Sequence, residues 1–173
     1  MQTSRHRFAI ALGSNLGDRL YHLREAVRLM RERLPRARLT AAAPIYETAP
    51  VDCPGGSGPF YNSVVEIECD ATPLEALAIL QGIERDLGRP ADHGRHAPRT
   101  LDLDLLCAGD MIMNDSALTL PHPRLSERRF VLQPLADICP SLVLPGRKES
   151  AGELLIRLPA TEMPLRLVLR DWV

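Results

Sequence analysis

Asp102 and Asp104, two aspartates separated by one residue, have the type and spacing to bind a metal ion. They belong to Arg99-Thr100-Leu101-Asp102-Leu103-Asp104-Leu105, in which Leu and Asp alternate. Because successive side chains of a strand point to opposite faces, both carboxylates share one face, separated by roughly 6.6 Å of rise. Such a pair can bind Mg²⁺, which takes one or two protein carboxylates together with phosphate oxygens of a substrate. Alternation alone is also typical of an edge strand with a solvated face, and by itself it favours that interpretation.

Three arginines precede the aspartates within one polar segment: Arg89, Arg95 and Arg99. Guanidinium groups match the geometry of phosphate and neutralise its charge during phosphoryl transfer. Metal-binding carboxylates next to an arginine-rich loop are expected where a nucleoside triphosphate is both held and activated. Any one of these arginines could equally be a solvated loop residue. Together with the aspartates, they indicate phosphate chemistry.

Two further features are weaker indications of a phosphate site. His122 stands between Pro121 and Pro123, whose restricted backbones would present its imidazole rigidly, although a lone histidine is more often structural. Gly13-Ser14-Asn15 follows an apolar run and could form a backbone phosphate nest, although a plain turn is commoner. The chain has no GxxxxGKS/T, GxGxxG, GxSxG or HExxH motif. Phosphate binding would therefore use neither of the common phosphate-binding loops.

The elements that must position these residues follow the order βαββαβ, which predicts an α+β fold. This order is typical of a ferredoxin-like core, an antiparallel sheet with helices packed on it, here with a C-terminal extension. Residues 1–173 are predicted to form a single domain. Residues 48–59 are a long Gly- and Pro-rich connection and hence a candidate functional loop. The predicted strands cover 8–12, 37–46, 61–69, 101–106 and 165–169, and the predicted helices cover 18–34, 73–87 and 126–136; residues 140–160 have no assignment.

The composition is that of an ordinary globular protein, with 173 residues, 45% of them hydrophobic and 25% charged. The longest apolar runs are far shorter than the ~20 residues of a membrane span, and the N-terminus lacks a signal-peptide pattern. A net charge of −1 gives no field that would attract nucleic acid or a membrane. The four cysteines form no CxxC pair, which indicates reduced thiols. We therefore expect a cytoplasmic monomer with small-molecule partners, and neither nucleic acid nor membrane.

Several segments together resemble one enzyme family, the 6-hydroxymethyl-7,8-dihydropterin pyrophosphokinases (HPPK) of folate biosynthesis. They occur in the family's order and cover most of the chain. The two most specific are Pro98-Arg99-Thr100-Leu101-Asp102-Leu103-Asp104 and Pro121-His122-Pro123-Arg124. The others include Ala11-Leu12-Gly13-Ser14-Asn15-Leu16-Gly17-Asp18, Tyr46-Glu47-Thr48-Ala49-Pro50-Val51, Phe60-Tyr61-Asn62, Leu87-Gly88-Arg89 and Glu127-Arg128-Arg129-Phe130-Val131-Leu132-Gln133-Pro134-Leu135.

The resemblance implies transfer of the β,γ-pyrophosphoryl group of ATP to the hydroxymethyl oxygen of the pterin, with AMP as the other product. It implies that Asp102 and Asp104 bind two Mg²⁺ ions that bridge the triphosphate, and that Arg89, Arg95 and Arg99 act with them in catalysis. The implied ATP contacts are Gln81, Glu84, Leu105, Thr119, His122 and Arg128. The implied pterin contacts are Thr48, Val51, Phe60, Asn62 and Phe130, where the two aromatic rings suit a flat heterocycle and Asn62 offers a donor and an acceptor.

The chain departs from the family pattern in two loops. Residues 90–93 lack basic side chains that better-known members carry, and His96 stands where they often have tryptophan. Ala49 replaces a common proline. These changes concern loop motion and ATP affinity, because the aspartate pair and the three arginines are still present.

Two other functions stay open on the sequence. A nucleotidyltransferase also combines a Gly-Ser turn with a DxD strand, but usually close together, whereas about ninety residues separate Gly13 from Asp102 here. That class would release inorganic pyrophosphate. A ferredoxin-like ligand-binding module is the non-enzymatic alternative, and it would bind nucleotide without magnesium.

Overall fold

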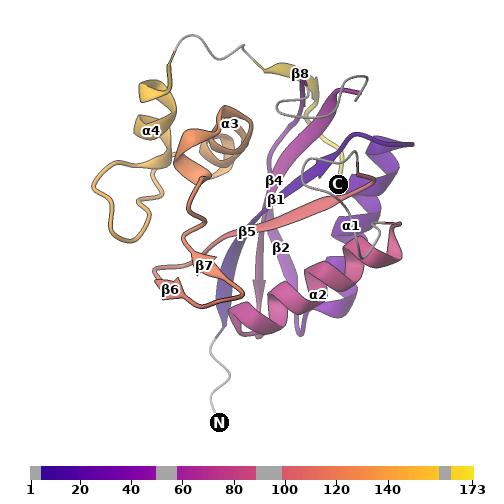
Figure 1. The fold of residues 1–173 in the computed structure, drawn as a ribbon, viewed down its shortest axis with the longest axis horizontal. Coiled ribbons are helices and arrows are strands. Elements are labelled where there is room, and N and C mark those ends of the chain that lie inside the picture. The colour runs from indigo at the N-terminus through magenta and orange to yellow at the C-terminus, as the bar shows by residue number, and fades with distance from the viewer. Residues whose placement is uncertain (1–4, 50–57, 89–98, 160–164) are drawn as a thin grey trace.

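The first part of the chain follows the predicted βαββαβ order, except that the second predicted strand is divided into two strands (Figure 1). The computed structural model describes residues 5–49, 58–88, 99–159 and 165–173. The core elements are β1 (His6–Ser14), α1 (Arg19–Arg33), β2 (Arg38–Ala42), β3 (Ile45–Thr48), β4 (Phe60–Cys69), α2 (Pro73–Asp86) and β5 (Asp102–Ala108). The C-terminal part contains β6 (Met113–Asn114), β7 (Thr119–Leu120), a 3-10 turn (Leu125–Glu127), α3 (Arg129–Ile138), α4 (Ala151–Arg157) and β8 (Arg166–Leu169).

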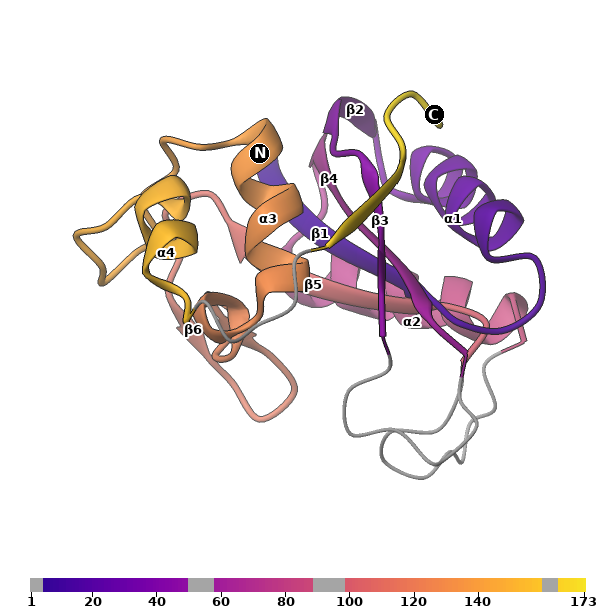
Figure 2. The same cartoon turned by 90° about the horizontal axis from the view of Figure 1, so that it is seen from above.

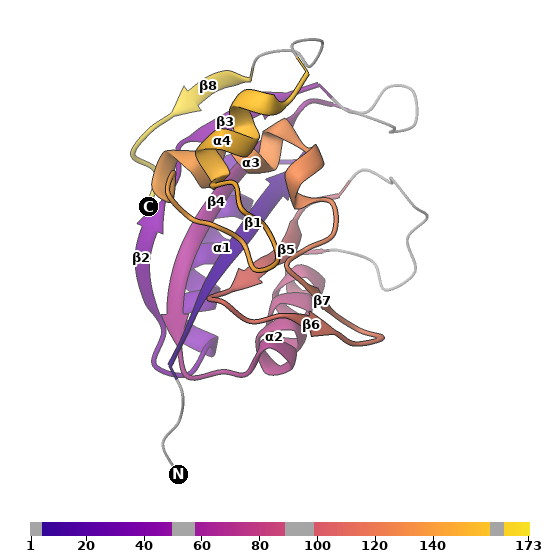
Figure 3. The same ribbon diagram turned by 90° about the vertical axis from the view of Figure 1, so that its left-hand side faces the viewer.

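The main sheet has the strand order β5-β1-β4-β3-β8, and β2 also pairs with β4. All of these pairs are antiparallel. With β2 and β3 counted as one interrupted strand, β5 is the last core strand and lies beside β1, and β1 lies beside the third strand, β4. This order is that of a ferredoxin-like core, so the predicted fold class is confirmed. Beyond this core, β8 extends the sheet at the edge of β3 (Figure 3).

Local sequence signals start the two core helices where they were predicted. The Asp18 side chain accepts a hydrogen bond from the Tyr21 N–H at 3.0 Å and caps α1. At α2, Thr72 and Glu75 form a reciprocal capping box and Pro73 occupies the first turn. These caps satisfy backbone N–H groups that a helix leaves without partners at its start.

The helices cover opposite faces of the sheet (Figures 1 and 2). On one face, α1 and α2 bury a cluster that includes Phe8, Ile10, Leu23, Met30 and Leu80. On the other, α3 and α4 bury a second cluster that includes Ala9, Val64, Leu106, Leu132 and Leu154. Because side chains alternate along each strand, one strand contributes to both clusters. None of the helices within the described ranges is long and apolar enough to cross a bilayer.

The single strand predicted over 37–46 is wrong, because the chain forms β2 and β3 with Ala43 and Pro44 between them. Pro44 has no N–H to donate to a strand ladder, which breaks the run at this point. Ala43 is fully buried, and its backbone polar groups have partners: its N–H donates to the Val64 carbonyl at 2.8 Å, and its carbonyl accepts from Ser63 Oγ and from Trp172 Nε1. This last hydrogen bond holds Trp172, near the C-terminus, against the break between β2 and β3, where the residue is 3% exposed.

The C-terminal extension also differs in detail from the expectation. The helix predicted over 126–136 is replaced by the short 3-10 turn and α3, because Arg128 has an extended backbone between them. The unassigned stretch 140–160 contains α4, which Ser150 and Glu153 start with a second capping box. The predicted strand over 165–169 is present as β8.

Candidate functional site

The carboxylates of Asp102 and Asp104 lie on the face of β5 opposite the α1/α2 core. The alternation prediction is confirmed here, because Leu103 and Leu105 are buried in that core at 5% and 3% exposure. Asp102 pairs with Gly13 and Asp104 pairs with Ala11 on the neighbouring strand β1. Both aspartates are partly buried. The pair therefore lies on the side of the sheet that carries α3 and α4.

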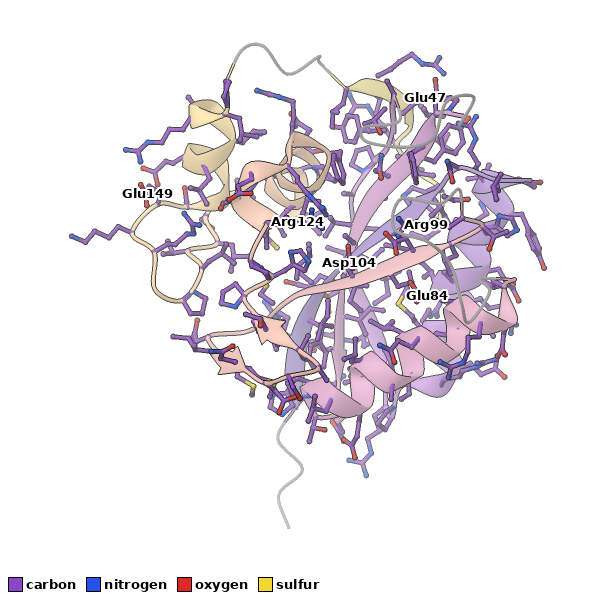
Figure 4. The ribbon with its side chains drawn as sticks, in the orientation of Figure 1. Glu47, Glu84, Arg99, Asp104, Arg124 and Glu149 are labelled. Atoms are coloured by element: carbon purple, nitrogen blue, oxygen red, sulfur yellow. The ribbon has the colours of Figure 1, made fainter. Side chains whose placement is uncertain are left out.

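The two aspartates concentrate negative charge that nearby cations only partly offset. Burial, and after it the charge of Asp102, raises the pKa of the Asp104 carboxyl, while His122, Arg128 and Arg99 act in the opposite direction. Arg99 Nη1 lies 2.8 Å from Oδ1 of Asp102. In Figure 4, Asp104 lies between Arg99 and Arg124. Residues from three segments, before β5, on β5 and before α3, thus meet at one point.

The donor set at this point fits a hard divalent cation shared with a substrate. Among the residues that the structure describes, no group of three or more His, Cys, Asp and Glu side chains could hold a metal ion. Two carboxylates supply part of an octahedral oxygen shell, and Mg²⁺ commonly takes the remainder from water and phosphate. A bound cation would also offset the repulsion that contributes to the raised pKa of Asp104.

His122 has its Nδ1 engaged as a hydrogen-bond acceptor, which leaves Nε2 as the donor of the neutral ring. Its backbone N–H donates to the Leu106 carbonyl at 2.8 Å, which fixes the segment against β5. Its Nδ1 accepts from the Arg124 N–H at 3.2 Å, so the proton of the neutral ring is on Nε2. Burial lowers the pKa of His122, against the opposing charge of Asp104. The ring therefore offers one N–H donor close to the aspartates.

Arg128 and Phe130 lie together at the start of α3. The guanidinium carbon of Arg128 is 5.5 Å from the centroid of the Phe130 ring. Burial lowers the pKa of Arg128, and the charges of Asp104 and Asp102 raise it; an arginine nonetheless stays protonated in proteins. Phe130 packs against the α3/α4 core. One residue predicted for ATP and one predicted for the pterin are therefore neighbours.

Gly13 is the point at which the acidic and the amide side chains meet. A Cβ added to Gly13 would lie 3.3 Å from Asn62 Oδ1, 3.8 Å from Asp102 Cβ and 3.8 Å from Phe60 Cδ1. Asn62 is 6% exposed, and its Nδ2 donates to Thr48 Oγ1 at 2.8 Å. The lack of a side chain at Gly13 therefore lets three predicted site residues from two strands approach one another.

Not all of the predicted ATP residues lie at this point. Leu105 faces the α1/α2 core instead, on the opposite side of the sheet from Asp104. Glu84 is 6% exposed on α2, and its Oε1 accepts from the Leu103 N–H at 2.7 Å. Gln81 on α2 and Thr119 on β7 are exposed. Their ATP contacts stay predictions. Val51, Arg89 and Arg95 lie outside the described residues.

Asn15 joins two loops, a role that the sequence did not predict, because Gly13-Ser14-Asn15 was interpreted as a plain turn or a backbone phosphate nest. Its Oδ1 accepts from the Arg99 N–H at 2.8 Å, its N–H donates to the Arg99 carbonyl at 3.2 Å, and its Nδ2 donates to the Gly58 carbonyl at 3.4 Å. Asn15 is only 6% exposed. Its position after the Gly-Ser pair at the end of a buried strand was the available signal, but the partners are 43 and 84 residues away.

A pocket of about 460 Å³ is lined by none of the described residues that are predicted to bind the pterin. Its lining includes His122, Ser126, Leu144, Arg147 and Lys148. Arg147 Nη2 donates to Ser126 Oγ at 2.6 Å across it. His122 is the residue that this pocket shares with the aspartate site.

Comparison with known proteins identifies the same family as the motifs. Residues 9–140 match the model of the family described as 7,8-dihydro-6-hydroxymethylpterin-pyrophosphokinase (HPPK). The 2-amino-4-hydroxy-6-hydroxymethyldihydropteridine pyrophosphokinase of Pseudomonas aeruginosa is 40% identical over 153 residues, 88% of this chain and 92% of the relative. The Bacillus subtilis protein of the same name is 45% identical over 130 residues, 75% of this chain and 76% of the relative.

Longer relatives contain a similar segment within a larger protein. The "Folate synthesis bifunctional protein, mitochondrial" of Pisum sativum is 43% identical over 80% of this chain, which spans only 26% of the pea protein. The wild-type HPPK-DHPS structure of Plasmodium falciparum superposes with a TM-score of 0.69 at 14% identity, covering 89% of this chain and 45% of that one, and shares its fold. On the family model and the two bacterial relatives, this chain belongs to the HPPK family.

Proposed function

We propose that this protein transfers the β,γ-pyrophosphoryl group of ATP to the hydroxymethyl oxygen of 6-hydroxymethyl-7,8-dihydropterin. One observation carries the proposal beyond family membership: Asn62 and Asp102 flank Gly13 from the two strands on either side of β1. A side chain suited to the edge of a pterin and a side chain suited to a metal–phosphate group are therefore neighbours. Transfer between two substrates requires such proximity of their reacting ends.

Asp102 and Asp104 would hold two Mg²⁺ ions together with the triphosphate. Bound there, the ions neutralise phosphate charge and polarise the phosphorus that is attacked. Arg99 and Arg128 add positive charge near the same carboxylates, and His122 adds the Nε2 donor. Charge-assisted hydrogen bonds of this kind stabilise the charge that develops on phosphate oxygens. Arg89 and Arg95 would contribute further guanidinium groups.

The pterin would bind beside this centre, between Phe60 and Phe130. Aromatic rings suit the faces of a bicyclic heterocycle. Asn62 donates to Thr48 through Nδ2, so its Oδ1 is the atom that can accept a hydrogen bond from the amino edge of the pterin. The Thr48 hydroxyl, already an acceptor for Asn62, can donate to the ligand. Val51 would complete the contacts.

The reaction exchanges one P–O bond for another. The hydroxymethyl oxygen forms a bond to the β-phosphorus, the bond from that phosphorus to the α,β-bridging oxygen breaks, and AMP leaves with the bridging oxygen. The hydroxyl proton is released in the same process. Because ADP is not formed, the nucleotide product distinguishes this reaction from an ordinary kinase reaction.

Identification of the nucleotide product tests the proposal. Purified protein incubated with ATP, Mg²⁺ and 6-hydroxymethyl-7,8-dihydropterin is expected to yield AMP and the pterin diphosphate in equal amounts, with no turnover when EDTA removes the metal. Formation of ADP, or ATP consumption that does not depend on the pterin, would contradict the proposal. Release of inorganic pyrophosphate would favour the nucleotidyltransferase. Nucleotide binding without turnover and without a need for magnesium would favour the ligand-binding module.

A further inference from the structure

One guanidinium group, that of Arg19, contacts both ends of the connection between β3 and β4. Its Nη1 donates to Glu47 Oε2 at 3.0 Å at the end of β3, and to the Pro59 carbonyl at 2.8 Å just before β4. The guanidinium carbon also lies 3.7 Å from the centroid of the Tyr61 ring on β4. Arg19 is 23% exposed at its side chain, and Glu47 is 17% exposed. This is a closely packed ion pair with a cation–π contact, unlike a freely solvated surface pair.

Arg19 occupies a position in α1 where its own helix does not stabilise a positive charge. Arg19 is the first residue of α1, where the helix dipole favours anions over cations. The α1 first turn contains no acidic residue. A cation at this end is stabilised by its partners on β3 and β4 and not by its own helix. The contact is therefore a link between α1 and the strand pair.

A second arginine, from the C-terminal strand, binds the other oxygen of the same carboxylate. Arg166 on β8 donates to Glu47 Oε1 through Nε at 3.1 Å and through Nη2 at 2.6 Å. Glu47 and Arg166 are direct partners in the β3–β8 pairing, and Figure 4 shows Glu47 beside β8. Hydrogen bonds from Arg166 and Arg19 lower the pKa of Glu47, so its carboxylate stays charged. Arg166 lies beyond residues 9–140, the part that matches the family model.

These contacts lie on the reverse face of the strand pair that carries the pterin residues. Glu47 faces Tyr61 across the β3–β4 ladder, and the next pair along is Thr48 and Phe60. Side chains of adjacent pairs point to opposite faces. Fixing Glu47, Pro59 and Tyr61 from behind therefore fixes the separation of Thr48 and Phe60 in front, and with it the Thr48–Asn62 hydrogen bond.

We propose that Arg19, Glu47 and Arg166 form a charged clip that positions Thr48 and Phe60 for the pterin, so that a C-terminal strand outside the family match contributes to substrate affinity. The three are positioning residues, because they act through Thr48 and Phe60. The inference rests on the proposed function, since it takes the pterin as the ligand that Thr48 and Phe60 contact. The clip predicts a selective effect: pterin affinity depends on it and nucleotide affinity does not.

The test measures the two ligands separately without turnover. The dissociation constant of 6-hydroxymethylpterin is measured by its fluorescence, in the presence of Mg²⁺ and α,β-methylene-ATP, which lacks the cleavable bridging oxygen. The dissociation constant of the methylene analogue alone is measured by calorimetry. Arg19→Ala is expected to weaken pterin binding about tenfold and to leave nucleotide binding within about twofold.

Matched variants separate the clip from general stability. Arg19→Lys keeps the charge and N–H donors for Glu47 and Pro59 but removes the planar guanidinium group that lies over the Tyr61 ring, so an intermediate loss is expected. Arg166→Ala is expected to weaken pterin binding about threefold, because Arg166 is more exposed and Arg19 still holds Glu47. Arg28→Ala removes exposed ion pairs to Glu25 and Glu32 within the same helix, and should leave both constants within about twofold.

A double variant tests whether the residues act as one unit. Arg19→Ala combined with Glu47→Ala should weaken pterin binding no more than the stronger single change, because each removes the same clip. Three outcomes would overturn the inference. The first is a double variant whose loss of pterin affinity equals the product of the two single losses. The others are an equal loss of nucleotide affinity and an Arg19→Ala protein that binds the pterin as the wild type does. If the wild-type protein itself fails to bind the pterin, the proposed function is wrong; if the wild type binds and Arg19→Ala is unaffected, the clip alone is wrong.

Discussion

The face of the sheet covered by α1 and α2 differs from the face covered by α3 and α4 in how its chemistry changes along the strands. On the first face, β1, β4 and β5 present apolar side chains along most of their lengths, such as Phe8, Ile67 and Leu103. On the second, the same strands are apolar at one end of the sheet, at Ala9, Val64 and Leu106, where α3 and α4 pack. At the other end of the sheet these strands carry Gly13, Asn62 and Asp102 at paired positions.

This comparison shows how a small antiparallel sheet can combine stability with a reactive site. Because alternation assigns each residue to one face, the polar positions on one face do not interrupt the apolar positions on the other. The change from apolar to polar or small residues occurs at the same end of three neighbouring strands, so the polar side chains lie close together. Changes on the two faces are therefore expected to affect different properties.

The largest expected effect comes from removing a carboxylate on the polar face. Asp104→Ala and Asp102→Ala are each expected to lower turnover by about two to three orders of magnitude or more, because charge stabilisation at the transferred phosphate is lost. The measurement is AMP formation at saturating ATP and Mg²⁺. The melting temperature should fall little, and Asp104→Ala should even remove the buried charge and the repulsion from Asp102 that together raise the pKa of that carboxyl. Full activity in either variant would exclude the metal-binding role.

Substitution of Leu103, which lies between the two aspartates in sequence but points to the other face of the sheet, is expected to affect stability instead of turnover. Leu103 is 5% exposed in the α1/α2 core, and Leu103→Ala should lower the free energy of unfolding by about 2–5 kcal/mol. Urea denaturation measures this loss. The folded fraction should keep the substrate constants of the wild type. A Leu103→Ala protein with normal stability and impaired turnover would show that the two faces are not separate.

A single added methyl group at the meeting point of the polar residues should have an intermediate effect. The Cβ of Gly13→Ala would lie 3.3 Å from Asn62 Oδ1, so Asn62 must shift by a few tenths of an ångström. We expect pterin affinity to fall about tenfold, because the shifted amide no longer fits the ligand edge. Fluorescence titration with 6-hydroxymethylpterin measures the change.

The control for Gly13→Ala is a methyl group added where there is room. At Gly82, inside α2, the nearest atom to an added Cβ is the end of the Arg85 side chain at 3.8 Å. Gly82→Ala is expected to stabilise the protein by about 0.5–1 kcal/mol through helix propensity, without a change in pterin binding. A loss of pterin affinity at Gly82→Ala equal to that at Gly13→Ala would contradict the role of close approach.

The smallest expected effect concerns the contact that joins α3 to the sheet on the polar face. Tyr46 on β3 donates its hydroxyl to Asp137 Oδ2 on α3 at 2.6 Å. Burial, followed by this hydrogen bond, raises the pKa of Tyr46 to about 12, against about 10 in an unfolded chain. The protonated form is thus favoured by folding, so the Tyr46 contribution to stability is complete below pH 10 and is lost as the pH rises toward 12. Melting temperatures between pH 9 and pH 11.5 should fall more steeply for the wild type than for Tyr46→Phe; parallel slopes would contradict the assignment.

Features that depend on neighbouring residues could be predicted from the sequence. The caps at Asp18 and Thr72, and the shared face of Asp102 and Asp104, follow from local hydrogen bonding and from the two-residue repeat of a strand. The family motifs added the prediction that Asn62 and Phe60 contact the pterin; the structure places both residues beside Gly13, and the pterin contacts themselves stay predictions.

Features that depend on side chains meeting across the fold could not be predicted. The double role of Asn15 requires Gly58 and Arg99 to arrive from two different loops, and no local pattern contains that information. The division of 37–46 into β2 and β3 depends on Pro44 and on Trp172, which reaches Ala43 from the end of the chain. The Leu105 side chain packs in the α1/α2 core, and the ATP contact that the family motif implies for this residue stays a prediction.

The interruption at Pro44 also bears on the tendency of the protein to self-associate. A long, straight edge strand exposes a row of backbone donors and acceptors that can pair with another molecule. Here β3 is covered by the four residues of β8, and β2 is a five-residue strand whose register shifts between Leu39 and Ala41. Short, bent and arginine-bearing edges are poor templates for strand addition between molecules. The break at Pro44 thus makes the β2/β3 side of the sheet a poor template for strand addition.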